Sequence, residues 1–501
     1  MSFTEPRFLL FLCVALTLYF VAPQRLRWYV LLVASYTFYW FMGGVFALCA
    51  ITTTIVSVYA CGRWAFKLRE KKASRAARRA PLAVCLTFNF ALLLLFRYSN
   101  VVLPSLGLLL ISGVSFYTFQ SAGYLIDIYK GKVTPERNVL KLALFVSFFP
   151  QLVQGPISRH GEVAADLIAG HGWSAERARE AVQRIVWGYF MKLVIADVIA
   201  VPVNAVFGDY RAYGGAVILV AVLMYSVQIY ADFAGGINVA IGVGKLVGVT
   251  MPENFAQPFF ARSLSDFWRR WHITLGAWLK DYLFYPLAIS KAFGKLGKAA
   301  RRILGAEKGK LVPACAATFI IYLVVGVWHG ITWVAVAFGL LNGAIITLSL
   351  FCEPTLATLR RKTHIDGSKN GFGRVFATLR TLAIVTFLRY FARAASLHTA
   401  LAMLKRTLLT PRLHQLSDGT LLGLGIERRE YVLLAVAIVI LLVRDVIAER
   451  GAAHGITAAD ALNKARPIVQ FAAMVLILGL ITYCGIYREG YIIADFIYAN
   501  H

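Results

Sequence analysis

Two histidines lie inside long apolar stretches of the chain, and each stands beside tryptophan. His272 belongs to Phe-Trp-Arg-Arg-Trp-His-Ile-Thr-Leu (267–275), and His329 belongs to Gly-Val-Trp-His-Gly-Ile-Thr-Trp (326–333). The other histidines lie in polar loops, at segment edges or at the C-terminus. An ionisable side chain at hydrocarbon depth is expensive and usually marks a reaction site or a pathway, and imidazole suits proton transfer near neutral pH. His272 and His329 are therefore the candidate catalytic residues.

The elements that must position these histidines are membrane helices. The chain has 501 residues, of which 59% are hydrophobic and 15% are charged, and long apolar runs recur from end to end. Helices satisfy their own backbone hydrogen bonds in lipid, and runs of about 20 apolar residues match their length. We therefore expect an all-α, polytopic transmembrane protein with about 11 to 13 crossings, the remaining helices being re-entrant or interfacial.

The candidate apolar segments lie near residues 7–22, 28–42, 44–61, 81–97, 104–122, 139–157, 180–206, 214–233, 236–250, 311–329, 331–351, 373–394, 431–447 and 467–487. The first of them follows the acidic Glu5 rather than a basic run and lacks a small-residue cleavage site. We expect it to be a retained helix rather than a removed signal peptide.

The formal net charge of +27 is concentrated in two short stretches, residues 62–80 and 291–310, which we expect to be loops. The positive-inside rule places both on the cytoplasmic side. The basic residues flank membrane segments and no separate soluble domain exists to carry a recognition fold, so nucleic-acid binding is disfavoured. Contact with anionic lipid headgroups accounts for the charge, although an acidic soluble partner or a phosphate-rich donor would be drawn to the same surface.

Several other motifs do not carry chemistry. The seven cysteines are scattered and form no C-x-x-C pair, so neither a disulfide framework nor a zinc site is indicated, and we expect no metal. H-E-x-x-H and G-x-S-x-G are absent, which leaves metalloprotease and α/β-hydrolase readings without support. For Lys192, Asp197, Asp127 and Asp232, which lie in or beside apolar segments, internal ion pairs or interfacial positions are favoured over catalysis.

The segment 266–287, which runs from Asp-Phe-Trp-Arg-Arg-Trp-His to Phe-Tyr-Pro-Leu, resembles the membrane-bound O-acyltransferases, as does Gly-Val-Trp-His-Gly at 326–330. The arginine pair and Tyr285-Pro286 resemble the alginate O-acetyltransferase branch. Further agreement comes from Ser-Phe-Tyr-Thr-Phe-Gln (115–120), Phe-Phe-Pro-Gln-Leu-Val-Gln-Gly-Pro-Ile-Ser-Arg (148–159) and Tyr-Ala-Asp-Phe (230–233). The resemblance covers roughly residues 1 to 345, and the last third of the chain is generic hydrophobic helix.

The resemblance implies one membrane-embedded domain over residues 1–501, with helices around a central funnel or tunnel. Its motif-bearing core would span about 100–345 and its C-terminal helices about 373–487. The implied reaction moves an acyl group from a cytoplasmic thioester, acetyl-CoA or an acyl carrier protein, to a hydroxyl outside. His329 would be the general base that removes the proton from the acceptor hydroxyl.

His272 would lie near the cytoplasmic side of the same conduit and bind or orient the donor. The alternative is a structural role, in which Trp268, Trp271 and Trp278 hold an interfacial amphipathic helix. The expected substrate-binding and donor-binding residues are Trp328, Arg269, Arg270, Trp271, Gln120 and Gln154. The two arginines suit the phosphates of a pantetheine-type donor, although lipid phosphate is the simpler partner.

The expected acceptor is a cell-surface or secreted polysaccharide, reached with a separate extracytoplasmic SGNH-hydrolase-like partner. An acidic acyl carrier protein would suit the basic cytoplasmic face. The alternatives are D-alanyl transfer toward teichoic acid and, from another class, a transporter or channel, for which the sequence lacks the internal symmetry that would favour it. The tail, residues 496–501, departs from the aromatic-rich ending of the alginate branch and puts a partner contact by terminal aromatics in question.

Overall fold

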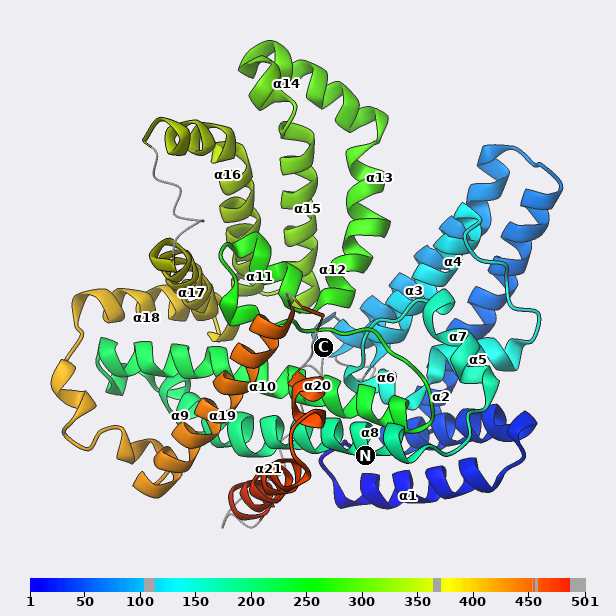
Figure 1. Cartoon of the computed structure of the whole chain (residues 1–501). Coiled ribbons are helices and arrows are strands. Elements are labelled where there is room, and N and C mark those ends of the chain that lie inside the picture. Colours follow the sequence, from blue (N-terminus) through cyan, green and yellow to red (C-terminus); the bar gives the residue numbers. More distant parts are fainter. Residues whose placement is uncertain (103–112, 364–370, 453, 456–457, 487–501) are drawn as a thin grey trace. The chain divides into compact units, whose positions relative to one another are not determined.

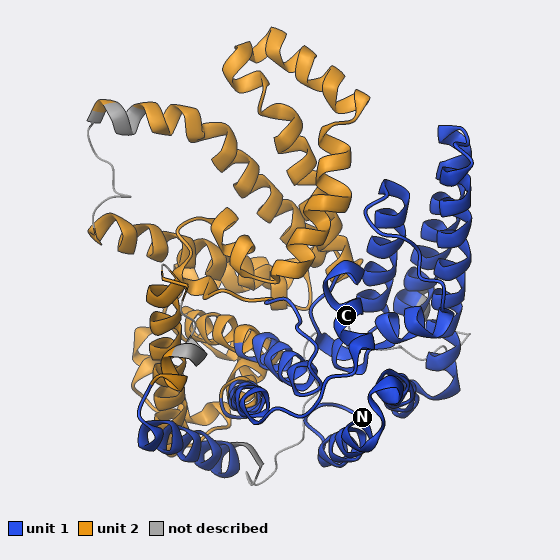
Figure 2. Cartoon of the chain, turned by 45° about the vertical axis from the view of Figure 1, so that its right-hand side comes forward, with its two compact units in different colours: residues 1–194, 231–253, 465–501 blue, residues 195–230, 254–464 orange. Residues whose placement is uncertain are grey.

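The computed structural model describes residues 1–102, 113–363, 371–452, 454–455 and 458–486, and these residues form helices joined by turns and short connections. Their one β-type pairing is an isolated bridge between Phe255 and Trp271. The described residues divide into two compact units. Unit 1 takes those within 1–194, 231–253 and 465–486, and unit 2 takes those within 195–230 and 254–464 (Figure 2). The expected all-α architecture is confirmed.

Unit 1 holds the helices of the first 194 residues and those of two later stretches of the chain. They are α1 (Pro6–Val21), α2 (Arg27–Glu70), α3 (Arg75–Val102), α4 (Val114–Lys130), α5 (Val139–Ser147), α6 (Phe149–Gln154), α7 (His160–Ala169), α8 (Ala175–Tyr189), the second half of α10 (Gly215–Leu246), and α21 (Pro467–Leu480) (Figure 1). Its core joins aromatic rings of α1, α2 and α6: the ring centroids of Phe8 and Phe38 are 6.0 Å apart and those of Phe11 and Phe149 are 5.3 Å apart.

Of two pairs of adjoining expected segments, the first is divided where expected and the second is a single helix. Segments 28–42 and 44–61 run on as α2, with a break at Gly43–Gly44 where Gly44 has φ +61° and ψ −155°, a region open in practice to glycine alone. Segments 214–233 and 236–250 form the continuous helix α10, so the boundary expected between them is wrong. The glycines there serve packing instead, since a Cβ on Gly235 would lie 2.8 Å from the carbonyl oxygen of Gly188.

Unit 2 begins in the π-helical stretch that continues α8. Its helices are α9 (Asp197–Gly208), the first half of α10, α11 (Leu264–Arg270), α12 (Ile273–Leu279), η6 (Lys280–Phe284), α13 (Tyr285–Ala288), α14 (Lys291–Gly309), α15 (Val312–His329), α16 (Trp333–Thr363), α17 (Gly371–Arg393), α18 (Leu397–Leu409), α19 (Arg428–Ala452) and α20 (Ala458–Asn463) (Figure 1). Helices α15 and α16 form a close pair through glycine: Cβ atoms built on Gly326 or Gly339 would each lie 2.9 Å from the Cα atom of the other.

The two basic stretches are mostly helical, so the expectation of loops is wrong. Within 62–80, α2 continues to Glu70 and α3 starts at Arg75, which leaves only a turn between them. The stretch 291–310 is almost entirely α14, whose N-cap Ser290 accepts a hydrogen bond from the backbone nitrogen of Phe293 (3.3 Å). Lysine, arginine and alanine are good helix formers, and serine is a preferred N-cap.

Nine helices among the described residues are long and apolar enough to cross a membrane: 24–70, 75–98, 175–208, 215–246, 312–329, 333–358, 371–393, 428–452 and 467–484. The number is below the expected 11 to 13 partly because segments 214–233 and 236–250 form one helix and the kinked helix α2 is counted once. Helix α1 is apolar but has 16 residues and α5 has nine. Part of the expected segment 104–122 and the tail 496–501 lie outside the described residues.

Candidate active site

His272 stands at a break between two short helices of unit 2. Helices α11 and α12 have seven residues each, and His272 between them adopts a left-handed backbone conformation, with φ +49° and ψ +54°. This conformation costs about 1–2 kcal/mol for a residue with a side chain. Backbone hydrogen bonds hold it, because Ala256 N donates to Arg270 O (3.0 Å) and Ile273 N donates to Asn254 O (3.0 Å). A continuous interfacial helix through this segment is therefore ruled out.

Asn254 fixes the orientation of the His272 ring. Its side-chain oxygen Oδ1 accepts hydrogen bonds from the backbone nitrogen and the hydroxyl of Thr274, at 3.0 and 2.9 Å, and lies 3.2 Å from His272 Nδ1. A backbone N–H can only donate, so this atom of Asn254 is the amide oxygen and Nδ1 of His272 carries the proton. The basic lone pair of the imidazole is therefore on Nε2.

Burial keeps this imidazole neutral. Asn254 is fully buried and His272 is 3% exposed, and burial lowers the pKa of His272 to about 3 because the charged form loses its hydration. At neutral pH the ring offers one N–H donor and one basic nitrogen rather than a positive charge. Sequence analysis identified His272 but missed Asn254, which lies 18 residues earlier in the chain.

His329 and His272 both contact Trp328. His329 is the last residue of α15 and is partly exposed, next to the extended Gly330. The indole of Trp328 lies 4.9 Å from the His329 ring and 6.3 Å from the His272 ring, measured between centroids. Phe338 of α16 meets the His329 ring edge-on at 5.7 Å. The structure thus brings both candidate catalytic residues and Trp328 into one part of unit 2.

Trp268 joins α11 to the helix pair that carries His329. Its indole N–H donates to the side-chain oxygen of Asn342 at 3.0 Å. Its ring centroid lies 5.6 Å from that of Tyr322 in α15 and 6.5 Å from that of Phe338 in α16. Since Asn342 is fully buried, this contact satisfies a polar group that would otherwise be expensive. The arrangement fixes the His272 segment against α15 and α16.

The two arginines expected to bind the donor are placed differently. Arg270 forms two hydrogen bonds with Glu449 of α19, at 2.5 and 3.1 Å, and a longer ion pair with Asp266 (3.4 Å). The hydrogen bonds to Glu449 raise the pKa of the Arg270 guanidinium. Arg270 therefore ties α11 to α19, a pairing across 179 residues that no local pattern indicates. The side chain of Arg269 is 75% exposed, and its ion pair with Asp266 is long, at 3.4 Å. Arg269 therefore remains accessible to an anionic group.

Trp271 is part of the interior of unit 2. Its ring is 2% exposed, stacks on Phe267 with centroids 5.5 Å apart, and lies under the guanidinium of Arg389 at 4.9 Å. Such a cation–π contact is stronger away from water. Trp278 is 9% exposed, so both rings pack inside the unit, which disfavours the alternative role of interfacial anchors for them. Sequence analysis also missed Arg389, because cationic residues at helix ends usually face solvent or lipid headgroups.

Gln120 and Gln154, the other expected substrate-binding residues, belong to unit 1, whereas both histidines belong to unit 2. Gln120 donates to Phe145 O (3.1 Å) and to Gln151 Oε1 (3.0 Å). Gln154 is fully buried, and neither atom of its amide has a hydrogen-bond partner among the described residues. Such a group is expensive to bury. Of the two glutamines, Gln154 is therefore the better candidate for binding a substrate.

The expected internal ion pair is confirmed for Lys192. Its ammonium lies 2.8 Å from Asp232 Oδ1, and the two side chains are 1% and 2% exposed. Both residues belong to unit 1 and to helices long and apolar enough to cross a membrane. Pairing offsets part of the large desolvation penalty of both charges.

Comparison with known proteins decides the family. Residues 135–389, which include both histidines, Asn254 and Trp268, match the family model of the membrane-bound O-acyltransferases. The chain belongs to this family. Together with the nine apolar helices, membership makes it an integral, multi-pass membrane protein.

The chain is similar to transferases of three kinds. A probable alginate O-acetylase of Pseudomonas putida is 34% identical over 357 residues, which cover 67% of this chain and 70% of the relative. A peptidoglycan O-acetyltransferase of Helicobacter pylori is 31% identical over 66% of this chain and 65% of its own. A teichoic acid D-alanyltransferase of Bacillus subtilis is 26% identical over 50% of this chain and 61% of its own. The chain spans about two thirds of the length of the curated acetylases it matches.

Proposed function

We propose that the chain is a membrane O-acetyltransferase that modifies a cell-surface or secreted polysaccharide. It takes acetyl from a cytoplasmic thioester, acetyl-CoA or an acyl carrier protein, and passes it to a hydroxyl on the extracytoplasmic side. The observation that carries the proposal is the pair of imidazoles at Trp328, within the matched region of a chain similar to alginate and peptidoglycan O-acetylating proteins.

In this proposal His329 is the general base. The acceptor oxygen attacks the thioester carbonyl carbon, a C–O bond forms, and the C–S bond breaks to release the thiolate. The imidazole takes the proton of the hydroxyl and returns it to the departing sulfur, so atoms and charges balance. His272, neutral and oriented by Asn254, accepts a hydrogen bond through Nε2 at the donor end of the reaction. Trp328 packs against the rings of both histidines. Of the two arginines, the exposed Arg269 is the one proposed to bind a donor phosphate.

Substituting His329 tests this assignment. We expect His329→Gln to reduce ester formation on surface glycans by about 10²–10⁴-fold, because a positioned general base contributes that factor. Base-labile esters on the glycan are measured by mass spectrometry, and membrane abundance and detergent-stable folding are compared with the unmodified protein.

His272→Ala is the companion variant. It should reduce ester formation less than His329→Gln does, since the proposal gives His272 an orienting role. Substantial ester in a well-expressed His329→Gln strain would overturn the assignment of the base. Equal losses in two normally folded variants would overturn the ranking of the two histidines.

The proposal also includes a partner. The chain is similar to proteins of polysaccharide-modifying systems, and we infer that a separate extracytoplasmic SGNH-hydrolase-like protein accepts the acetyl group and delivers it to the polymer. On the cytoplasmic side, an acidic acyl carrier protein suits the basic stretches 62–80 and 291–310.

Reconstitution tests the need for the partner. We expect the purified protein in liposomes, supplied with acetyl thioester and polysaccharide alone, to hydrolyse the donor slowly without acetylating the glycan. Thiol release and glycan-bound acetyl are the two measurements. Efficient acetylation by this chain alone would place acceptor recognition within it and refute the relay.

D-alanyl transfer toward teichoic acid is the second candidate. Its support is the teichoic acid D-alanyltransferases of Bacillus subtilis and Streptococcus thermophilus, which are 26% and 28% identical to this chain over 50% and 56% of its length. The acetylating relatives match more of the chain at higher identity. The glycan analysis described for His329 separates the two, because acetyl and D-alanyl esters differ in mass. A transporter, the third alternative, would leave no ester dependent on His329.

A further inference from the structure

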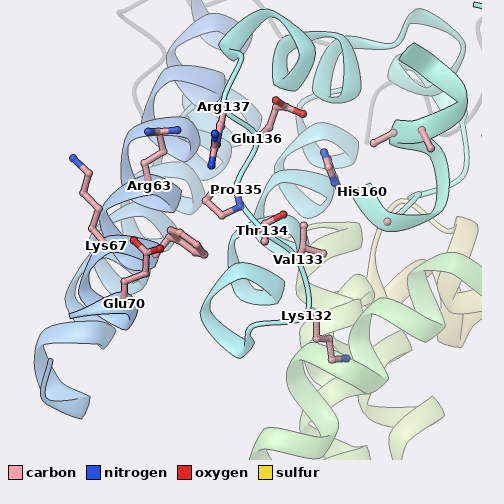
Figure 3. A pocket seen from close by; sticks show the side chains of 14 residues that line it. Arg63, Lys67, Glu70, Lys132, Val133, Thr134, Pro135, Glu136, Arg137 and His160 are labelled. Atoms are coloured by element: carbon pink, nitrogen blue, oxygen red, sulfur yellow. The ribbon is translucent and has the colours of Figure 1, made fainter. Parts of the chain in front are cut away.

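Unit 1 contains a pocket that none of the expected catalytic residues line. Its volume is about 950 Å³, within the range of about 300–1,000 Å³ that is usual for ligand sites. The end of α2, the segment 132–137 that connects α4 to α5, and the first residues of α7 form its walls (Figure 3).

The pocket has an excess of positive charge. The cationic side chains are Arg63, Lys67, Lys132 and Arg137, and the carboxylates are Glu70 and Glu136. None of these four cations forms an ion pair with a carboxylate in the described part of the chain, and Glu136 Oε1 already accepts a hydrogen bond from the backbone nitrogen of Asn138 (3.0 Å). A net charge of +2 in a recess favours an anionic ligand.

One tyrosine contacts both segments that carry the arginines of the pocket. The Tyr59 hydroxyl donates to the backbone carbonyl of Arg137 at 2.8 Å, and the Arg63 guanidinium lies 5.8 Å from the centre of the same ring. Figure 3 shows both arginines lining the pocket, one from α2 and one from the connecting segment. Guanidinium groups suit the oxygens of a phosphate, which they can bind in bidentate fashion.

The location and the rest of the lining indicate a lipid rather than a soluble anion. Arg63 and Lys67 lie in the last two turns of α2, within a helix long and apolar enough to cross a membrane, and α3 follows as another. Basic residues at the ends of such helices lie at headgroup level. The remaining wall includes apolar side chains, namely Phe66, Val133, Pro135, Ala164 and Ala165. A ligand with both a charged and an apolar part fits this combination.

One side of the pocket is aromatic and uncharged. The His160 ring packs on Tyr124 with centroids 4.8 Å apart and meets Phe145 edge-on at 5.0 Å. Burial lowers the pKa of His160, and the nearby Glu136 carboxylate opposes the shift only in part. The imidazole is therefore neutral at neutral pH and offers a hydrogen bond to a headgroup hydroxyl without adding charge.

We propose that this pocket binds the headgroup of an anionic phospholipid. Arg63 and Arg137 hold the phosphate, Lys67 and Lys132 add attraction, and the glycerol backbone rests on the apolar wall. The inference does not depend on the proposed acyl transfer. A soluble phosphate ester shares the charge but has nothing to place on the apolar wall.

The test uses the full-length protein purified in detergent and titrated separately with phosphatidylglycerol, phosphatidylcholine and glycerol 3-phosphate. Thermal unfolding and lipid retained in native mass spectrometry are measured. Phosphatidylglycerol should raise the melting temperature and be retained, whereas the other two compounds should do neither at equal concentration. Arg63→Gln with Arg137→Gln should weaken phosphatidylglycerol binding about tenfold or more.

The matched control is Arg75→Gln with Arg79→Gln, which removes the same charge from exposed positions of the same basic stretch outside the pocket. It should bind phosphatidylglycerol as the unmodified protein does. If the arginine variant does not fold, Lys67→Gln with Lys132→Gln removes equal charge without touching Tyr59 and should also weaken binding. Wild-type binding by a folded pocket variant, equal binding of phosphatidylcholine, or equal stabilisation by glycerol 3-phosphate would each overturn the proposal.

Discussion

At the scale of single residues, sequence reasoning identified the two histidines but not what holds them. The cost of a buried imidazole indicated His272 and His329, and the structure places both beside Trp328. Asn254 could not be predicted, because an Asn-Phe pair in a polar connection carries no signal for a contact with a residue 18 positions later. The left-handed backbone of His272 escaped prediction for a similar reason, since tertiary contacts rather than local propensity impose it.

The neutral state of His272 predicts how stability depends on pH. Burial lowers its pKa from 6.5 to about 3, so between these values the unfolded chain binds a proton that the folded chain does not. The stability from this group is therefore complete above pH 6.5 and falls as the pH drops toward 3, by about 1.4 kcal/mol per pH unit.

His272→Asn isolates this effect, because asparagine tolerates the left-handed backbone and does not titrate there. We expect the melting temperature in detergent to fall more steeply between pH 6.5 and pH 5 for the unmodified protein than for the variant. Parallel curves would mean that the folded protein accommodates a charged imidazole at this position.

At the scale of elements, apolar runs predicted where helices lie but not how they join or break. Segment lengths gave α15 and α17 nearly to the residue. The same pattern divided α10 in two, because Gly235 and its neighbour look like a boundary when they are a packing surface. The break at Trp271–His272 divides the aromatic-rich segment for which an amphipathic helix was the alternative interpretation. Backbone hydrogen bonds between that segment and residues 254–256 hold the break in place. Sequence periodicity does not indicate such a contact.

The glycine contact between α15 and α16 predicts a sensitive position. A Cβ on Gly339 would lie 2.4 Å from the carbonyl oxygen of Tyr322, so Gly339→Ala must push the helices apart and destabilise the protein by about 1–3 kcal/mol. Because α15 ends at His329, acyl transfer should fall as well. Thermal unfolding and the ester assay measure the two effects.

Gly294→Ala provides the control, since nothing lies within 4 Å of a Cβ built on this exposed residue of α14. It should leave the melting temperature unchanged or raise it slightly. A Gly339→Ala protein as stable and active as this control would show that the two helices can separate without effect.

At the scale of the whole molecule, composition predicted a helical membrane protein, and the fold and family agree with it. What composition could not give is the distribution of the charged residues inside it. Lys192 meets Asp232, Arg270 meets Glu449 and Arg389 covers Trp271. Each pairing joins residues 40 or more positions apart, and side chains at such separations meet only through tertiary packing.

Orientation in the membrane is the remaining prediction at this scale. Cysteines introduced at Ser74, in the turn after α2, and at Gly294 of α14 are expected to face the cytoplasm. Both positions are exposed, whereas a cysteine at the neighbouring Gly297 would meet Pro313 at 2.9 Å. In a background without the native cysteines, a membrane-impermeant maleimide should label them only after the cytoplasmic face is opened. Labelling in intact cells would show that these positions face outward. The protein would then have the opposite orientation, and the donor would lack a route from the cytoplasm.

The ion pair between Lys192 and Asp232 also constrains how the protein is made. Its two charges belong to successive apolar helices, and Lys192 leaves the ribosome 40 residues before its carboxylate partner. Each charge alone adds about 2.5–3.5 kcal/mol to the free energy of inserting the centre of a helix into the bilayer. The earlier helix therefore enters the membrane at a disadvantage that is relieved only when the later one arrives. Biosynthesis thus favours a waiting period in which both helices stay at the insertion machinery and enter the lipid as a pair.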